Sequence, residues 1–186
     1  VNYIEECIDA IYENNLPLGT DLSVYVIDGM SDDGTRGKLV LLAVKYPSLK
    51  MIDNVKQQTP FAFNLGIVED KNVDFVQIVG VRQILSSNYL KNAMLLLESN
   101  DEVWCVGGKV NNVFLNHKGE IIAKAMATTF GMGLGNFRTL PNSGYVDTVG
   151  TPMYKYKVFD KIGLFDEALI RNQDDDFNYR VTQEGG

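Results

Sequence analysis

The sequence has few residues of the types that build zinc sites, disulfide frameworks or histidine-based catalytic systems. Its 186 residues include one histidine, two cysteines and one tryptophan. A lone histidine, His117, has no second histidine with which to form a zinc site or a nucleophile system. Cys7 and Cys105 lie far apart in apolar surroundings, so we expect both to be reduced core residues in a reducing compartment.

Basic charge and long hydrophobic runs are also scarce. The chain has 17 Lys and Arg against 24 Asp and Glu, which gives a formal net charge of −7. Nucleic-acid-binding proteins usually carry a basic surface, so this balance argues against a nucleic-acid partner but not against a nucleotide. No apolar run approaches the ~20 residues that span a bilayer, and no signal peptide is present. We therefore expect membrane association only through segments outside this chain.

The remaining composition is that of a globular protein. Hydrophobic residues make up 45% of the chain, and the length predicts one domain over residues 1–186. The sequence contains no internal repeat, low-complexity segment or linker. Because it starts with Val1 and stops at a Gly-Gly pair, we expect it to be a fragment of a longer polypeptide.

Predicted helices and strands alternate at short spacing as far as residue 108. Apolar periodicity, caps and proline or glycine stops predict helices over 3–15, through 39–46 with a stop at Pro47, from 59 to about 69, and through 90–97 after a cap at 86–87. They predict strands over 22–27, 49–52, 73–79 and 102–106. This alternation is typical of a parallel sheet covered by helices on both faces. Such a sheet normally opens with a strand, so we expect one strand to precede Val1.

The pattern changes after residue 110. We expect a hairpin over 114–122 that turns at 117–119, and a loop or short helix over 123–143. A strand over 144–149 and a short helix over 156–162 follow. The last helix is predicted to begin near Asp174, with Phe177 and Val181 on one face.

An apolar strand ends in Asp28 and runs into a polar loop, over residues 22–35. Gly29 and Gly34 allow a sharp turn. In open α/β sheets ligands bind at the carboxyl ends of strands, so Asp28 is placed to face a ligand. An alternative interpretation is an ordinary strand-to-helix loop in which the acids only cap the next helix.

Four stretches in order resemble inverting family 2 glycosyltransferases, in particular the branch that builds bacterial exopolysaccharides such as succinoglycan. They are residues 26–35, residues 53–54 with 62–66, residues 144–149 with 158–167, and residues 171–180. Each stretch alone is a weak signal, but four in the family's order form a specific pattern that covers nearly the whole chain.

The resemblance implies an α/β GT-A fold, with a Rossmann-like, mostly parallel sheet flanked by helices and its first strand missing from this chain. Residues 1–108 would form the nucleotide-sugar-binding half and residues 109–186 the acceptor-binding half. The implied reaction moves a sugar from a nucleotide diphosphate donor, expected to be a UDP-sugar, to a glycan or lipid-linked acceptor in polysaccharide biosynthesis. The resemblance further implies a bacterial cell-envelope role and a cytoplasmic location, at the inner face of the plasma membrane.

The resemblance also assigns site residues. Asp174, in the acidic motif, would be the general base that deprotonates the acceptor. For the acids at positions 174–176 the alternative interpretation is ordinary helix-start chemistry, because acids favour that end of a helix. The remaining roles implied are donor binding by Asp28, Asp53 and Arg82, and acceptor binding by Asp147, Asp175, Asp176 and Arg180.

The chain departs from the family at its metal site. Relatives end the fourth strand with an acidic motif that binds Mg²⁺ or Mn²⁺, but the corresponding residues here are Gly80, Val81 and Arg82. No metal ligand is therefore assigned. Either Arg82 replaces the ion at the diphosphate, or activity has been lost and Arg82 is a surface residue paired with an acid. A shifted alignment with Asp74 or Asp101 as a ligand is a third interpretation.

The second of these interpretations defines an alternative function. The chain would then be a catalytically inactive GT-A-like module that binds a nucleotide sugar or a protein partner.

Overall fold

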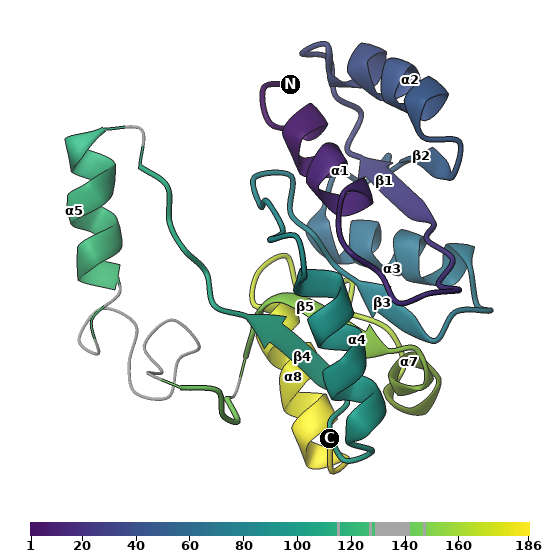
Figure 1. Cartoon of the computed structure of the whole chain (residues 1–186), viewed down its shortest axis with the longest axis vertical. Helices are drawn as coiled ribbons and strands as arrows, with labels where there is room; N and C mark the ends of the chain where they lie inside the picture. The colour runs from purple at the N-terminus through teal and green to yellow at the C-terminus, as the bar shows by residue number, and fades with distance from the viewer. Residues whose placement is uncertain (115, 127, 129–141, 147) are drawn as a thin grey trace.

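Helices and strands alternate along the first 108 residues, as the sequence pattern predicts (Figure 1). The computed structural model describes residues 1–114, 116–126, 128, 142–146 and 148–186. In chain order the elements are α1 (Ile4–Tyr12), β1 (Val24–Asp28), α2 (Thr35–Lys45), β2 (Leu49–Asp53), α3 (Thr59–Glu69), β3 (Phe75–Gln77), α4 (Tyr89–Ser99), β4 (Cys105–Gly108), α5 (His117–Met126), β5 (Gly150–Lys155), α7 (Lys157–Ile162) and α8 (Gln173–Gln183).

The strands of the described residues form a parallel pair and a three-stranded sheet. β1 and β2 run parallel, in a register that sets Val24 opposite Leu49 and Asp28 opposite Asp53. β5 lies between β3 and β4 and is antiparallel to both, so β3 and β4 run in the same direction as each other. A strand from the last third of the chain therefore occupies the centre of a sheet whose outer strands come from the first 108 residues.

The α1 helix packs on α2 through an apolar stripe. Its buried residues, Ile4, Cys7 and Ile8, have the spacing that places them on one helix face. Ile4 and Ile8 pack with Leu39 and Leu42 of α2, and the same cluster continues into β2. This cluster fixes α2 against the parallel pair and so fixes where α2 begins relative to the strand ends.

Aromatic rings hold α8 against β5 and α7. The Phe177 side chain is fully buried, and its ring centroid lies 5.2 Å from that of Tyr154, 5.3 Å from that of Phe159 and 4.3 Å from that of Phe165. Such offset and edge-to-face pairs add to the free energy gained by burial. Because Phe177 is anchored, the first turn of α8 is fixed relative to the sheet.

Asn64 on α3 joins two segments that are 101 residues apart in the sequence. Its side-chain amide donates to the carbonyl oxygen of Phe165 and to Glu167, at 2.9 and 3.0 Å, and its oxygen accepts from the Phe165 backbone N–H at 3.0 Å. Both segments belong to the stretches that carry the family resemblance. Their proximity gives Asn64 a structural role in the fold.

The hairpin predicted over residues 114–122 is wrong, because α5 covers this region. The Asn116 side chain accepts the backbone N–H of Gly119 at 2.9 Å, as a helix-capping residue does. One turn later, Lys124 pairs with Glu120 at 2.7 Å. Positions 118 and 119 thus belong to the first turn of a helix, although Lys-Gly pairs also occur in hairpin turns.

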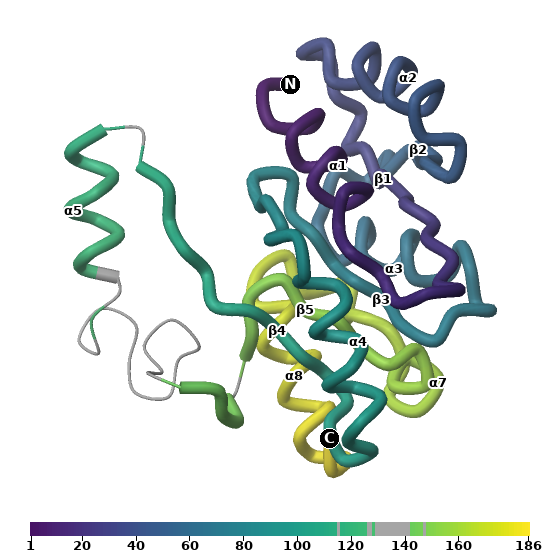
Figure 2. The backbone as a smooth tube through the Cα atoms, in the orientation of Figure 1, coloured from purple at the N-terminus to yellow at the C-terminus, as the bar shows by residue number. Residues whose placement is uncertain are grey.

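The strand predicted over 144–149 is also wrong, because β5 begins later, at Gly150. After β4 the chain leaves the body of the molecule, and α5 stands apart from the other helices (Figures 1 and 2). We refer to the described residues of 109–128 as the arm. No helix among the described residues is long and apolar enough to cross a membrane.

We predict that Phe177→Ala lowers the free energy of unfolding by about 3–5 kcal/mol, because it leaves a cavity inside the aromatic cluster. Urea unfolding followed by circular dichroism measures this change. The matched control is Tyr179→Ala on the same helix, whose side chain is exposed, and which we expect to change stability by less than about 0.5 kcal/mol. Equal losses in the two variants would contradict the assignment of Phe177 to the core.

Candidate active site

Two carboxylates and one arginine meet at the carboxyl ends of β1 and β2. The parallel register places Asp28 opposite Asp53. Arg36, in the first turn of α2, donates through Nη1 to Asp28 Oδ2 at 2.7 Å and lies 2.8 Å from Asp53 Oδ1. Two of the sequence-predicted donor-binding residues, Asp28 and Asp53, are thus brought together, and both contact one cation.

Arg36 is a site residue that the sequence analysis missed. It lies eight positions after Asp28, at the start of the helix that follows the loop. The available signal was a cation in the first turn of a helix that follows a strand ending in an acid. That signal becomes specific only when the second strand supplies Asp53.

The contacts of Asp28 and Asp33 distinguish between the two interpretations of the acids at the loop between β1 and α2. Asp33 accepts the backbone N–H and the hydroxyl of Thr35, the first residue of α2, at 3.1 and 2.6 Å. Asp28 instead accepts the Ser31 backbone N–H at 3.0 Å and the Arg36 guanidinium. The capping interpretation therefore applies to Asp33, and Asp28 has a different role. The loop turns through positive φ at Met30 and at Gly34.

Asp28 is held in its charged form. Asp28 is 5% exposed, and this burial by itself raises the pKa of its carboxyl group. Hydrogen bonds from Ser31 and the ion pair with Arg36 outweigh burial and lower the pKa below its ordinary value. Asp28 is therefore an ionised hydrogen-bond acceptor at neutral pH.

Arg82 lies in the turn that follows β3, with its guanidinium 5.9 Å from the centre of the Tyr3 ring. Within the described residues no carboxylate lies within 4.0 Å of it, so the paired surface arginine of the alternative interpretation is not seen there. The arginine is exposed. Its contact with a diphosphate stays a prediction.

The described residues contain no dedicated cluster of side chains for a divalent cation. Mg²⁺ and Mn²⁺ need oxygen ligands, usually including one or two carboxylates. Among the described residues, no group of three or more His, Cys, Asp or Glu side chains is placed to hold an ion. Asp74 precedes the first residue of β3, at the opposite end of that strand from residues 80–82. Asp101 lies 3.9 Å from Lys155, so neither acid supplies the missing ligand.

The acids of the last motif occupy the first turn of α8. Asp174 and Asp175 are exposed, and Asp176 accepts from Arg180 Nε at 3.0 Å. The Arg180 guanidinium also donates to the carbonyl oxygens of Ile162 and Leu164, both at 2.9 Å. These bonds give Arg180 a structural role that joins α8 to α7. Asp147, the other predicted acceptor residue, lies outside the described residues.

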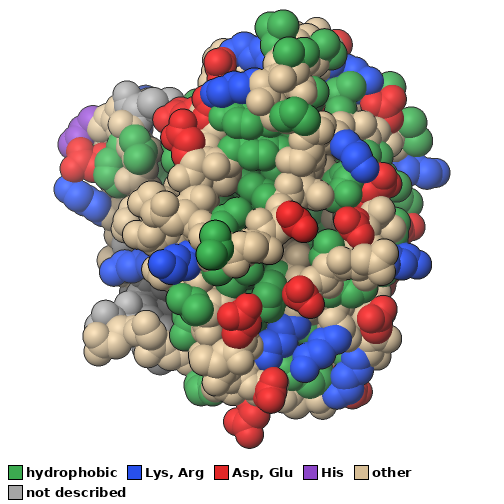
Figure 3. All heavy atoms as spheres, turned by 45° about the vertical axis from the view of Figure 1, so that its right-hand side comes forward, with side chains coloured by type: hydrophobic (Ala, Val, Ile, Leu, Met, Phe, Trp, Pro, Cys, Tyr) green, Lys and Arg blue, Asp and Glu red, His purple; other side chains and the backbone are tan. Residues whose placement is uncertain are grey.

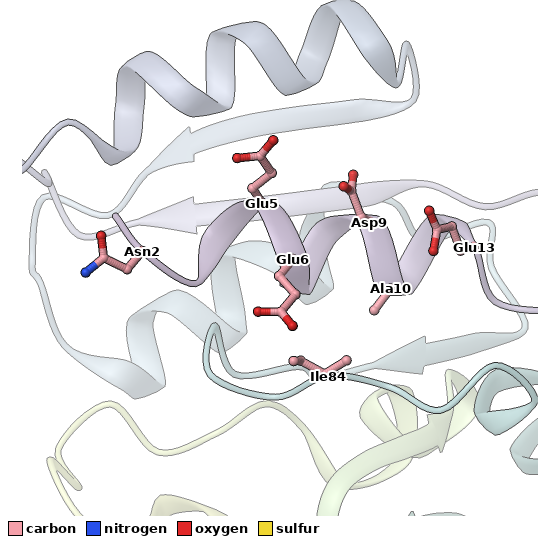
Figure 4. Close-up of a pocket in the computed structure, with 7 residues that line it drawn as sticks. All are labelled: Asn2, Glu5, Glu6, Asp9, Ala10, Glu13 and Ile84. Atoms are coloured by element: carbon pink, nitrogen blue, oxygen red, sulfur yellow. The ribbon is translucent and has the colours of Figure 1, made fainter. Parts of the chain in front are cut away.

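A hollow beside α1 is lined by acidic side chains and does not suit a nucleotide diphosphate. Figure 4 shows the acids along α1, with Ile84 facing Glu6 across the hollow. Its lining residues are Asn2, Glu5, Glu6, Asp9, Ala10, Glu13 and Ile84. Carboxylates repel a diphosphate, so we do not place the donor here.

Acidic and basic side chains both occur on the face shown in Figure 3.

Comparisons with known proteins show what the chain resembles in sequence and in fold. No family model matches the chain. The succinoglycan biosynthesis protein ExoA of Rhizobium meliloti (strain 1021) is 24% identical in an alignment of 183 residues that covers 96% of this chain and 54% of that protein. The solved structure of the mannosyltransferase PcManGT from Pyrobaculum calidifontis, in complex with GDP-Man and Mn²⁺, matches 99% of this chain with a TM-score of 0.71 and 19% identity. The match covers 49% of PcManGT.

The two likenesses confirm the resemblance to family 2 glycosyltransferases and the GT-A fold. The chain spans about half the length of the relatives that it matches. What those complete proteins bind and transfer is therefore not carried over to this chain as a finding.

We predict that Arg36→Met lowers the free energy of unfolding at neutral pH by about 1–3 kcal/mol, because it leaves a buried carboxylate without its cation. The pKa of Asp28 is depressed in the folded chain, so its stabilising contribution exists above the unfolded-state pKa and is lost as the pH falls through the folded-state pKa. The difference in the free energy of unfolding between wild type and variant should therefore decrease as the pH falls below about 4. Urea unfolding across a pH series measures it.

The control is Lys38→Met on the same helix, which removes an exposed ion pair with Glu5 at 3.6 Å. We expect it to cost less than about 1 kcal/mol. A difference between wild type and Arg36→Met that does not depend on pH would contradict the role given to the Arg36–Asp28 pair.

Proposed function

We propose that the chain is the donor-binding and catalytic part of an inverting glycosyltransferase of polysaccharide biosynthesis. The donor is a UDP-sugar, the acceptor is a glycan or a lipid-linked glycan, and the location is cytoplasmic. The observation that carries the proposal is the pairing of Asp28 with Asp53 at the carboxyl ends of two parallel strands. Ligands of open α/β sheets bind at that edge. The succinoglycan relative and the mannosyltransferase fold support the reaction class.

In this proposal Asp28 binds the nucleobase. Its carboxylate is ionised and accepts the ring N–H of uracil, while Arg36 keeps it charged and in place. Guanine also presents a ring N–H beside a carbonyl group, and the solved mannosyltransferase contains GDP-Man. The preference for uridine therefore rests on the family resemblance, and Asp28 alone does not select between the two bases.

Asp174 acts as the general base. The acceptor hydroxyl attacks the anomeric carbon on the face opposite the diphosphate, so the new C–O bond forms as the bond to the phosphate oxygen breaks, and the configuration inverts. The hydroxyl proton passes to the Asp174 carboxylate, which needs to lie within hydrogen-bond reach of it. The neighbouring Asp175 is exposed on the same turn and is proposed to contact the acceptor, as is Asp176.

The departing diphosphate carries negative charge that a cation must stabilise. No acid cluster among the described residues fits an ion, so we assign this task to Arg82, whose planar guanidinium can bind two phosphate oxygens. To reach the donor its side chain has to leave the Tyr3 ring. The missing metal motif equally favours the second candidate function, a catalytically inactive module that binds a nucleotide sugar or a protein partner.

We predict that Asp174→Asn lowers the rate of nucleoside diphosphate release at least about 100-fold, because removal of a general base typically costs that much or more. Donor affinity, measured by titration calorimetry, should stay within about twofold, since the base contacts the acceptor and not the donor. The control is Asp160→Asn, an exposed acid on α7, which should leave both quantities unchanged. If wild type binds the donor but releases no diphosphate with any acceptor, the inactive module is the correct function.

We further predict that turnover persists in excess EDTA and that Arg82→Gln reduces it at least about tenfold, because the arginine takes the place of the ion. Diphosphate release measured with EDTA, and with added Mn²⁺, tests this. The control is Lys56→Gln, a cation on the loop after β2 whose ammonium lies over the Phe61 ring. Turnover only with added Mn²⁺ would refute the arginine mechanism and leave the donor-binding role of Asp28 intact.

A further inference from the structure

The arm exposes apolar side chains that belong to none of the hydrophobic clusters in the described part of the chain. Ile121 and Ile122 of α5 are 55% and 60% exposed, and Val113 and Phe114, which lead into the helix, are 89% and 43% exposed. None of the three hydrophobic clusters found among the described residues includes them. In Figure 2 the helix stands clear of the other elements.

The apolar side chains gather on one face of α5. Ile121 and Ile122 lie four and three positions before Ala125, so the three residues share a face. An adjoining face carries His117, Glu120 and Lys124, in which Glu120 lies 2.7 Å from Lys124 and 3.4 Å from His117. The charged side chains of the polar face therefore pair with one another, whereas the apolar side chains belong to no hydrophobic cluster among the described residues.

The charge of the arm is opposite to that of the chain as a whole. Its described residues include Lys109, Lys118 and Lys124 against one acid, Glu120, although the chain has a net charge of −7. Lys118 is exposed and lies three and four positions before the two isoleucines, so it shares their face. A lysine there can lay its aliphatic stem along an apolar layer and reach an anion with its ammonium group.

We propose that α5 lies on a lipid surface that carries anionic headgroups. Ile121 and Ile122 enter the boundary between headgroups and acyl chains, Phe114 lies beside them, and Lys118 contacts the headgroups. This surface belongs to the chain itself, whereas the sequence predicted membrane contact only through segments outside it. The inference does not require transferase activity. With a lipid-linked acceptor, it would bring the arm to the bilayer that holds the acceptor.

A second copy of the chain is a poorer occupant of this face. A ten-residue helix is roughly 15 Å long, so its apolar face offers at most a few hundred Å². Stable protein interfaces bury about 800 Å² on each partner. Binding to a bilayer needs no such minimum area, because burial of apolar side chains and attraction to anionic headgroups both contribute to the affinity.

Vesicle flotation tests the proposal with the chain as it is. We expect the wild type to float with vesicles of equal parts phosphatidylcholine and phosphatidylglycerol, and at least about tenfold less with phosphatidylcholine alone. The double variant Ile121→Asp with Ile122→Asp should lose at least about tenfold of this binding, and Lys118→Glu should also weaken it. The matched control is Leu41→Asp with Val44→Asp on α2, whose side chains are 72% and 81% exposed, and it should bind as the wild type does.

Failure of the wild type to float with the mixed vesicles would overturn the proposal, as would equal losses in the α5 and α2 variants. A concentration-dependent dimer, seen by light scattering and abolished by the α5 double variant, would assign this face to a second copy instead. The substituted residues are exposed, so far-ultraviolet circular dichroism should be unchanged. If the double variant does not fold, Lys118→Glu decides the outcome.

Discussion

The ion pairs of Arg36 with Asp28 and Asp53 determine the arrangement at the strand ends. Two carboxylates placed side by side by the parallel register repel one another, and one of them is buried. A single guanidinium at 2.7 and 2.8 Å neutralises that repulsion. It also links the loop after β1, the end of β2 and the start of α2. Asp28 can therefore be both buried and ionised.

The second half of the chain is joined to the first by buried contacts. β5 pairs with β3 and β4, Asn64 binds the Phe165 backbone, and Ile67 of α3 lies in the same buried cluster as Phe177 of α8. Each contact joins segments that are far apart in the sequence. The acids of α8 are consequently held by the same core that supports the sheet, and not by a separate unit.

Local signals were sufficient for most of the fold and for part of the site. The Thr59-Pro60 pair predicted the start of α3, which ends at Glu69 as expected, and the apolar run before Asp28 predicted that this acid ends its strand, as it does. Arg36 was missed because its role depends on Asp53, which only the pairing of β2 with β1 brings near. The helix at 117–126 was predicted as a hairpin, since a capping asparagine and a Lys-Gly pair suit either structure. The bonds from Arg180 to two backbone carbonyls likewise depend on the packing of α7.

The central claim is that the donor nucleotide binds at the carboxyl ends of β1 and β2 and that its sugar reaches α8. A crystal structure of the chain with a bound UDP-sugar tests this claim most directly. The account predicts the uracil N–H within hydrogen-bond distance of Asp28 and the anomeric carbon between Asp28 and Asp174. A nucleotide bound elsewhere, or Asp28 and Asp174 on opposite sides of the molecule, would contradict it.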